Sequence, residues 1–162
     1  MGADYFYCTD PDGEFAWQMG YTNGSESPLE YSYRPENRFI AAYVYKYQEP
    51  KTIPICRWFH PIAGHHFYCP AGKSRKAFWF EGVEFYCYAK EEEGTTPMYR
   101  MYNPTTQIHF YTVDLDEVER KLRKGWKTEQ DLGYVFYKPG HPGTVPLYRW
   151  IKPSRYDQVP SP

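Results

Sequence analysis

Short stretches of alternating polar and apolar residues run along this chain, and turn-forming residues separate them. Within residues 39–47, Ile40, Ala42 and Val44 lie on one face of the predicted strand, and alanine and tyrosine lie on the other. A period of two residues is typical of a β-strand. The 15 prolines and 12 glycines interrupt the chain too often for many long helices. The pattern therefore predicts an all-β protein built from short strands.

One segment has a helical pattern instead. In residues 114–124, Leu115, Val118 and Leu122 recur at helical spacing. Acidic residues stand at the start of this segment, basic residues stand at its end, and Gly125 follows it. This arrangement is typical of a helix with its termini. We therefore expect one short helix at about 114–124 on the outside of the β structure.

A short motif with a central arginine recurs along the chain. Its arginines are Arg57, Arg100 and Arg149. The first two are each followed, nine residues later, by the histidine of an aromatic segment, which is His66 or His109. A tyrosine precedes each arginine by 12 residues, at Tyr45, Tyr88 and Tyr137. Agreement at several distances without gaps predicts internal repeats.

The first and last copies of the repeat complement each other. The chain opens with DYFYC at 4–8, which matches the second half of the repeat, and VPLYRW at 145–150 matches the first half. A closed ring needs such complementary ends, whereas a linear array does not, and closure removes exposed sheet edges. We expect three pseudo-equivalent repeats closed in a ring, with a β-trefoil-like body. A three-bladed propeller-like body is the alternative.

We expect a single domain that contains all three repeats. At 162 residues the chain is long enough for a single core. We expect repeats at about 1–53, 54–96 and 97–145, with 146–153 completing the first. Residues 1–153 then form the domain, and 154–162 form a loose tail.

Two copies carry a recognisable pattern. Residues 97–104 read PMYRMYNP, and HFYT at 109–112, GW at 125–126 and GYVFY at 133–137 follow. CRW at 56–58, HFYC at 66–69 and EGVEFY at 81–86 match in the middle copy. This pattern resembles a tandem repeat family of unknown function from bacterial cell-surface and cell-wall-associated proteins and some fungal proteins. The resemblance implies an accessory, glycan-associated module without established catalytic residues. It pairs Tyr86 with Tyr137, whereas the arginine spacing pairs Tyr88 with Tyr137, so this register is open.

Charge and composition exclude several classes of protein. The net charge of −1 argues against nucleic acid as a partner, and no apolar run approaches the roughly 20 residues of a membrane span. As written, the chain has no signal peptide, so we expect a cytoplasmic protein, or an extracellular or cell-surface protein if this is a mature or recombinant form. Four cysteines lack the spacing of a zinc ribbon, which leaves free thiols and disulfides open: Cys8, Cys56, Cys69 and Cys87.

The three repeat arginines lie between apolar neighbours on predicted strands. An inward-facing arginine needs a carboxylate or carbonyl partner, so we expect each to hold one repeat to the next or to stack on a tyrosine ring. A ligand-facing arginine in each repeat is the alternative. His66 and His109 fit a contact between repeats better than a metal site, which needs three or four converging ligands. We expect no metal, no cofactor and no catalytic residue, since no catalytic motif occurs.

Aromatic residues make up 20% of the chain, and 18 of them are tyrosines. Rigid rings beside polar side chains suit sugars, because the apolar face of the sugar stacks on a ring while its hydroxyls form hydrogen bonds. The alternative is that most of these rings fill the core. The candidate ligand-binding residues are Trp79, Trp126, Trp58, Trp150, Tyr102, Asn103, His66, His109 and Glu81. Trp79 and Trp126 follow variable loops, and we expect them at the surface.

These observations favour a lectin-like carbohydrate-binding protein without catalysis. Up to three weak sites, one in each repeat, would add avidity, and the partners would be glycans or glycoconjugates. A protein–protein interaction or structural module with an aromatic face is the alternative. A glycan-active enzyme ranks third. The sequence leaves the sugar and the oligomeric state open.

Overall fold

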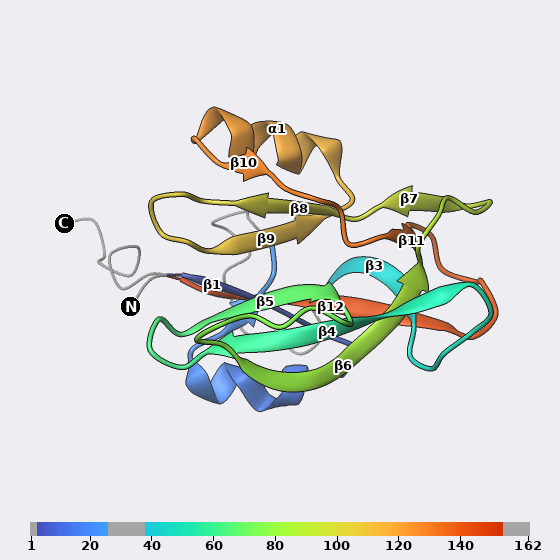
Figure 1. Ribbon diagram of the computed structural model, residues 1–162, viewed down its shortest axis with the longest axis horizontal. Coiled ribbons are helices and arrows are strands. Elements are labelled where there is room, and N and C mark those ends of the chain that lie inside the picture. The colour runs from blue at the N-terminus through green and yellow to red at the C-terminus, as the bar shows by residue number, and fades with distance from the viewer. Residues whose placement is uncertain (1–2, 26–37, 154–162) are drawn as a thin grey trace.

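The structure is a computed structural model that describes residues 3–25 and 38–153, whose arrangement is shown in Figure 1. The tail expected at 154–162 lies outside the described residues. The described chain is mostly β-sheet, so the predicted all-β class is confirmed. No helix within these two ranges is long and apolar enough to cross a membrane.

The described strands form one sheet of nine strands and one of three. The large sheet has the order β1-β12-β3-β11-β6-β4-β5, with β2 paired to β12 and β7 to β11, and the small sheet has the order β10-β8-β9. The strands are β1 (Asp4–Cys8), β2 (Thr22–Asn23), β3 (Phe39–Tyr45), β4 (Thr52–His60), β5 (His65–Pro70), β6 (Trp79–Tyr88), β7 (Thr95–Pro97), β8 (Tyr99–Tyr102), β9 (His109–Thr112), β10 (Lys127–Thr128), β11 (Tyr134–Phe136) and β12 (Thr144–Lys152).

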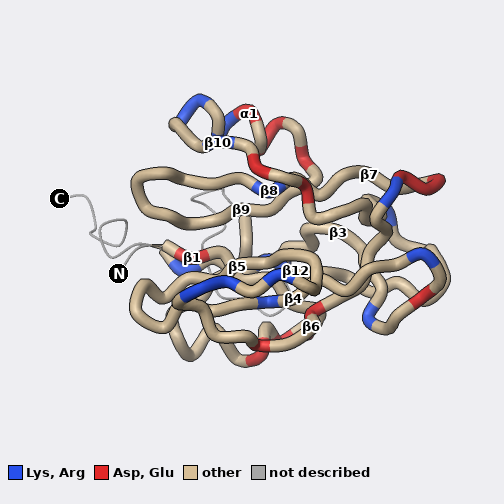
Figure 2. The backbone as a smooth tube through the Cα atoms, in the orientation of Figure 1, with Lys and Arg blue, Asp and Glu red and all other residues tan. Residues whose placement is uncertain are grey.

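Helices lie on opposite sides of this β structure. The α-helix α1 (Leu115–Arg123) lies against the small sheet, and the 3-10 helix η1 (Gly13–Met19) lies at the far side, beyond β4 and β6 (Figure 1). Charged residues are spread over most elements, and an acidic run at 91–93 leads into β7 (Figure 2).

Helix α1 occupies the segment in which the sequence predicts a helix, but its inner face differs from the expected one. Leu115 and Leu122 are 61% and 47% exposed. The buried residues are Glu117, Val118 and Lys121. The two charged residues are buried because the surface beneath carries partners for them: Glu117 pairs with Arg149, and Lys121 donates to a tyrosine hydroxyl. The inner face of α1 therefore buries two charged residues with partners, whereas the two leucines face outward.

One hairpin-like pairing occurs three times with the same register. β4 pairs with β5, β8 with β9, and β12 with β1, all antiparallel. In each pair the arginine of the motif lies opposite a tyrosine: Arg57 with Tyr68, Arg100 with Tyr111, and Arg149 with Tyr7. The third pair joins the two ends of the chain. The C-terminal VPLYRW strand therefore lies beside the N-terminal DYFYC strand, in the register of the other two pairs.

The three tyrosines form a closed cycle of hydrogen bonds. The hydroxyl of Tyr7 donates to the carbonyl of Tyr111 at 2.6 Å and accepts from its N–H at 2.9 Å. The hydroxyl of Tyr111 contacts the carbonyl and N–H of Tyr68 at 3.3 and 2.7 Å. The hydroxyl of Tyr68 contacts the same two groups of Tyr7 at 2.6 and 2.7 Å. Each tyrosine is 1% exposed, so these bonds replace water at three buried backbone sites.

A second aromatic set lies where β3, β6 and β11 pair with one another. Tyr45 and Tyr88 each meet Phe136 edge-on, with ring centroids 5.9 and 6.0 Å apart. Tyr137 is 52% exposed instead. The assignment of Tyr137 as the counterpart of Tyr45 and Tyr88 is therefore wrong, and the counterpart is Phe136. The chain has one extra residue between β11 and Arg149, so Phe136 lies one position further from its arginine than Tyr45 and Tyr88 do from theirs.

All four cysteines are buried free thiols. Cys8 and Cys87 are 0% and 2% exposed, and burial raises the pKa of the Cys87 thiol to about 12. These side chains therefore behave as small apolar core residues. The choice between thiols and disulfides, which the sequence leaves open, is resolved in favour of thiols.

Candidate functional site

Each of the three arginines lies over a phenylalanine from a neighbouring strand pair. The guanidinium carbons of Arg57, Arg100 and Arg149 are 4.8, 5.0 and 4.8 Å from the ring centroids of Phe6, Phe67 and Phe110. The expected stacking on a ring is present, but the ring is phenylalanine rather than tyrosine. The tyrosines are occupied in the hydrogen-bond cycle instead. What distinguishes the three places is the set of carboxylates around each arginine.

Arg57 has the richest set of partners. Its Nη1 and Nη2 donate to the two carboxylate oxygens of Glu14 at 2.6 and 3.0 Å. Its Nε donates to Glu81 at 2.9 Å, and Nη1 also reaches Glu84 at 3.1 Å. The forked contact with Glu14 is the bidentate geometry that fixes an arginine most firmly. Three carboxylates therefore surround one guanidinium.

Glu14 reaches Arg57 from a backbone turn of unusual shape. Gly13, Glu14 and Phe15 have φ angles of 61°, 52° and 59°, all in the left-handed region. Such a conformation costs non-glycine residues about 1–2 kcal/mol each and is often found at functional sites. A Cβ at Gly13 would lie 2.5 Å from Cε2 of Trp150, so the position also requires glycine for space. The turn holds the Glu14 carboxylate against Arg57.

His66 extends the same network inward. Its Nδ1 lies 2.6 Å from Oδ2 of Asp4, its backbone N–H donates to Oδ1 of Asp4 at 2.8 Å, and its Nε2 lies 3.2 Å from Glu81. The hydroxyl of Tyr21 donates to the same Asp4 at 2.6 Å. Burial lowers the pKa of His66, but the carboxylates of Asp4 and Glu81 outweigh burial and raise this pKa to about 9. A protonated imidazole donates from both nitrogens and matches these contacts.

The carboxylates around Arg57 have different protonation behaviour. Burial raises the pKa of Glu84 to about 7, against the opposing effect of Arg57. Burial also raises the pKa of Glu81, but the bonds from His66 and Arg57 outweigh this, so the pKa of Glu81 lies below its usual value. Glu81 is therefore ionised at neutral pH, with 31% of its side chain exposed. It is a charged acceptor that a ligand can reach.

A cavity of about 350 Å³ opens over this network. Its aromatic wall includes Phe6, Tyr21 and Phe59, and its polar wall includes Arg57, Glu81, Glu14, His66 and Lys152. Trp79 pairs in register with Phe59 and is 64% exposed. An indole therefore lies beside the strand that lines the cavity. Aromatic rings with a few converging polar groups are typical of small-molecule sites.

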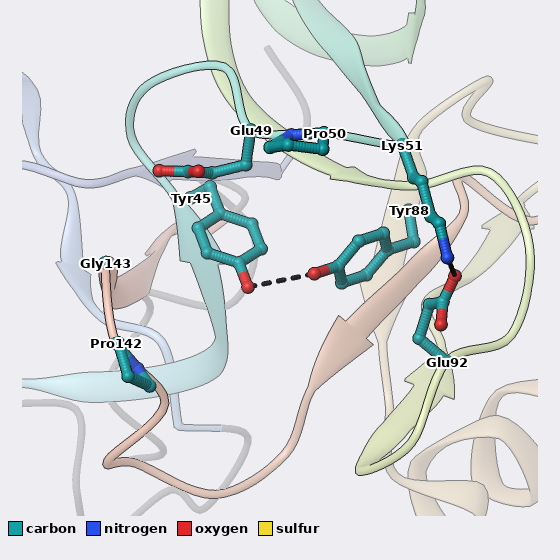
Figure 3. Close-up of a pocket in the computed structure, with 8 residues that line it drawn as sticks. All are labelled: Tyr45, Glu49, Pro50, Lys51, Tyr88, Glu92, Pro142 and Gly143. Atoms are coloured by element: carbon teal, nitrogen blue, oxygen red, sulfur yellow. Dashed lines mark hydrogen bonds and ion pairs between the residues drawn. The ribbon is translucent and has the colours of Figure 1, made fainter.

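A second hollow, of about 500 Å³, lies between the loops at the other aromatic set (Figure 3). The hydroxyls of Tyr45 and Tyr88 are 3.0 Å apart at its base, and Lys51 pairs with Glu92 at 3.6 Å on its rim. The Lys51 side chain is 74% exposed. The remaining lining residues belong to short loops: Glu49, Pro50, Pro142 and Gly143. The cavity at Arg57 offers the better combination of aromatic and charged groups.

Several predicted ligand-binding residues lie elsewhere. Trp126 and Trp150 are 9% and 3% exposed, so the prediction that Trp126 lies at the surface is wrong. Trp126 is buried because it packs edge-on against Tyr5 and Phe110 beneath α1. Trp58 is half-buried and packs on a phenylalanine on the opposite face of its strand pair from the cavity. Tryptophan in this protein fills the core more often than it lines a site.

The predicted ligand-binding residues of the repeat at about 97–145 have mainly structural contacts. His109 is 1% exposed and lies between Phe67 and Tyr102, with ring centroids 4.7 and 5.0 Å away. Asn103 accepts from the backbone N–H of Thr105 at 2.9 Å and so shapes a turn. Of the predicted set, His66 and Glu81 meet in the cavity, and Trp79 lies beside it.

Sequence reasoning missed four contributors to this network: Asp4, Glu14, Tyr21 and Phe59. Glu14 and Tyr21 come from the irregular segment around η1, whose sequence does not match the segments after β5 and β9. Asp4 has a weak signal, because it precedes the position at which the other copies have histidine. No group of three or more histidine, cysteine or acidic side chains within the described chain is arranged to hold a metal ion.

Comparison with known proteins identifies a family but no function. The sequence pattern of a domain of unknown function, DUF5648, matches residues 73–159. This range is more than half of the chain, so the protein belongs to that family. Neither the curated proteins nor the solved structures contain a match.

Proposed function

We propose that this member of the DUF5648 family is a lectin-like carbohydrate-binding protein without catalysis, and that its principal sugar site is the cavity over Arg57 and Glu81. The cavity itself is the observation that supports this. It combines aromatic rings with an ionised, partly exposed carboxylate that is held in place by two cations. Sugar sites need both kinds of surface in one place.

The contacts leave acceptor capacity free for a sugar. Arg57 and His66 both contact the same oxygen of Glu81, Oε1. A carboxylate offers about four lone-pair sites on its two oxygens, so Oε2 can accept from two sugar hydroxyls. Trp79 and Phe59 supply rings on which the apolar face of a sugar can stack. The charged network is already formed without ligand, which lowers the cost of ordering it on binding.

We also propose that the architecture is a pseudo-threefold ring. The tyrosine cycle and the mutual pairing of β3, β6 and β11 support this proposal. The three-stranded orders β1-β12-β3 and β5-β4-β6 favour the propeller-like alternative over the β-trefoil. In such a ring the three arginine positions are related, but Arg149 is 1% exposed. Sugar sites in all three positions are therefore not expected.

A protein partner is the second candidate function. Phe15 and Met19 of η1 are 58% and 65% exposed, next to the cavity. Exposed apolar groups that lie close together are typical of interaction surfaces. A partner chain could cover η1 and the cavity together.

A glycan array with the purified protein tests the first proposal, followed by calorimetric titration of the sugars that bind. We expect Trp79→Ala to weaken binding at least tenfold with an unchanged melting temperature, since Trp79 is 64% exposed. Glu81→Gln should weaken binding at least tenfold and also lower the melting temperature, because Glu81 bonds Arg57 and His66. Tyr47→Ala is the matched control, because Tyr47 is 74% exposed and lies outside the cavity. Absence of glycan binding at millimolar concentration would refute the proposal. Ligand recovered chemically unchanged would distinguish a lectin from an enzyme.

A further inference from the structure

The three arginine–phenylalanine contacts differ in one respect. Two arginines receive a bidentate carboxylate from a segment that follows the neighbouring strand: Glu14 follows β1 and binds Arg57, and Glu117 follows β9 and binds Arg149. The corresponding segment for Arg100 follows β5 and supplies no carboxylate. At Arg100 the guanidinium also lies over a phenylalanine, Phe67, but no carboxylate comes from the segment that follows β5.

The guanidinium of Arg100 is incompletely bonded as a result. Its Nε donates to Glu129 at 3.1 Å, and its Nη1 has only a long contact with the carbonyl of Tyr68 at 3.4 Å. Nη2 has no partner among the described residues. The Arg100 side chain is 15% exposed, whereas the Arg149 side chain is 0% exposed. Its free donors are therefore within reach of a ligand.

The segment that follows β5 supplies positive charge instead of negative charge. The guanidinium carbon of Arg75 lies 3.9 Å from the Phe67 centroid, and that of Arg100 lies 5.0 Å from the same centroid. Lys73 is exposed in the same segment. The facing anions are Glu129, already bonded to Arg100, and Asp131. Two guanidiniums on one ring with a single bonded carboxylate leave an excess of positive charge.

We propose that Arg100 and Arg75 bind the carboxylate of an acidic sugar, such as a uronic acid, in the place that Glu14 and Glu117 take at the other two arginines. The choice of a sugar rests on the proposed carbohydrate-binding function. It is supported by Tyr102, which lies on the same face of β8 as Arg100 and is half-buried. A sugar ring can stack on Tyr102 while its carboxylate occupies the guanidinium fork.

Titration of the full chain with glucuronate, followed by arginine and backbone NMR resonances, tests this site. We expect glucuronate to shift the resonances of Arg100 and Arg75, and to bind at least tenfold more tightly than glucose. Arg100→Gln and Arg75→Gln should each weaken glucuronate binding at least tenfold. Arg123→Gln is the matched control, because the Arg123 side chain is 76% exposed on the outer face of α1.

A charge reversal provides a second test. Arg75→Glu places a carboxylate in the segment after β5, where it can bind Arg100 as Glu14 binds Arg57. We expect this variant to fold with an equal or higher melting temperature and to lose glucuronate binding. Retained binding would overturn the assignment. Acetate or phosphate binding as tightly as glucuronate, or a short polyaspartate peptide binding more tightly, would overturn the sugar as the ligand.

The two proposals can fail separately. Glu81→Gln leaves the Arg100 position intact, so its glucuronate affinity should be unchanged. If no neutral sugar binds but glucuronate binds in an Arg100-dependent manner, the cavity at Glu81 fails as a sugar site and the acidic site stands. If Glu81-dependent sugar binding is found and glucuronate binds no better than glucose, the acidic site fails alone.

Discussion

Removing one hydroxyl from the tyrosine cycle should destabilise the whole protein. We consider Tyr111→Phe, which deletes a single oxygen at a site that is 1% exposed. That oxygen accepts from the N–H of Tyr68 at 2.7 Å and donates to its carbonyl at 3.3 Å. The phenyl ring keeps its packing, so the loss isolates the hydrogen bonds from the aromatic contacts.

The magnitude follows from what remains unsatisfied. The N–H of Tyr68 loses its partner in a place without water, which costs about 1–3 kcal/mol. The carbonyl has a second lone pair and a longer bond, so its contribution is smaller. We expect a loss of about 2–3 kcal/mol in the free energy of unfolding, or a fall in melting temperature of about 4–12 °C at about 2–4 °C per kcal/mol.

Urea unfolding monitored by tryptophan fluorescence measures this loss, with calorimetry for the melting temperature. Tyr7→Phe and Tyr68→Phe should each cost a similar amount, because their hydroxyls have the same two contacts. The double variant Tyr7→Phe/Tyr68→Phe should deviate from additivity, since the groups share one network. Tyr47→Phe is the control at an exposed position and should change stability by less than about 0.5 kcal/mol. Tyr111→Phe within the range of that control would refute the structural importance of the cycle.

Three further predictions concern the charged sites. Gly13→Ala should cost roughly 2–4 kcal/mol, from left-handed strain and from the clash with Trp150, and should also weaken sugar binding; denaturant unfolding and titration check both. Glu117→Gln should cost about 3–5 kcal/mol in the same unfolding assay, because it leaves Arg149 buried without its carboxylate. The pKa of His66 is raised to about 9 in the folded state, from about 6.5 when unfolded, so its stabilisation is complete below pH 6.5 and is lost as pH rises through 9. Unfolding free energy measured between pH 6 and 10 should fall more steeply with pH for the wild type than for His66→Gln.

Strand positions could be predicted from the sequence because the same residues recur at fixed distances. Arg57 and Arg100 lie opposite Tyr68 and Tyr111 because the intervening turns have similar lengths. A period of two also fixes which side chains share a face. Fixed spacing predicts the wrong counterpart where a residue is inserted, as one is between β11 and Arg149. Counting 12 residues back gives Tyr137, whereas the packed ring is Phe136, one position earlier.

The candidate site was harder to predict because its key groups are not periodic. Glu14 reaches Arg57 only because Gly13 and two following residues adopt left-handed backbone conformations. No local pattern marks that conformation on a glutamate. The burial of Trp126 was missed for a related reason. Its position after a variable loop suggests exposure, but α1 folds over it and brings Lys121 to within 4.7 Å of its ring.

The three arginine positions indicate where function can differ while the fold stays the same. Arginine, phenylalanine and tyrosine keep the same relative positions at all three, so they cannot by themselves distinguish a binding site from a structural contact. The difference comes from the segments after β1, β5 and β9. The segment after β1 contributes Glu14 beside an open cavity. The segment after β5 contributes Arg75 and no acid. The segment after β9 is α1, whose Glu117 pairs with the buried Arg149. Exchange of the segments after β1 and β5, which leaves Glu117 on the buried Arg149, should therefore transfer binding properties without disturbing the tyrosine cycle.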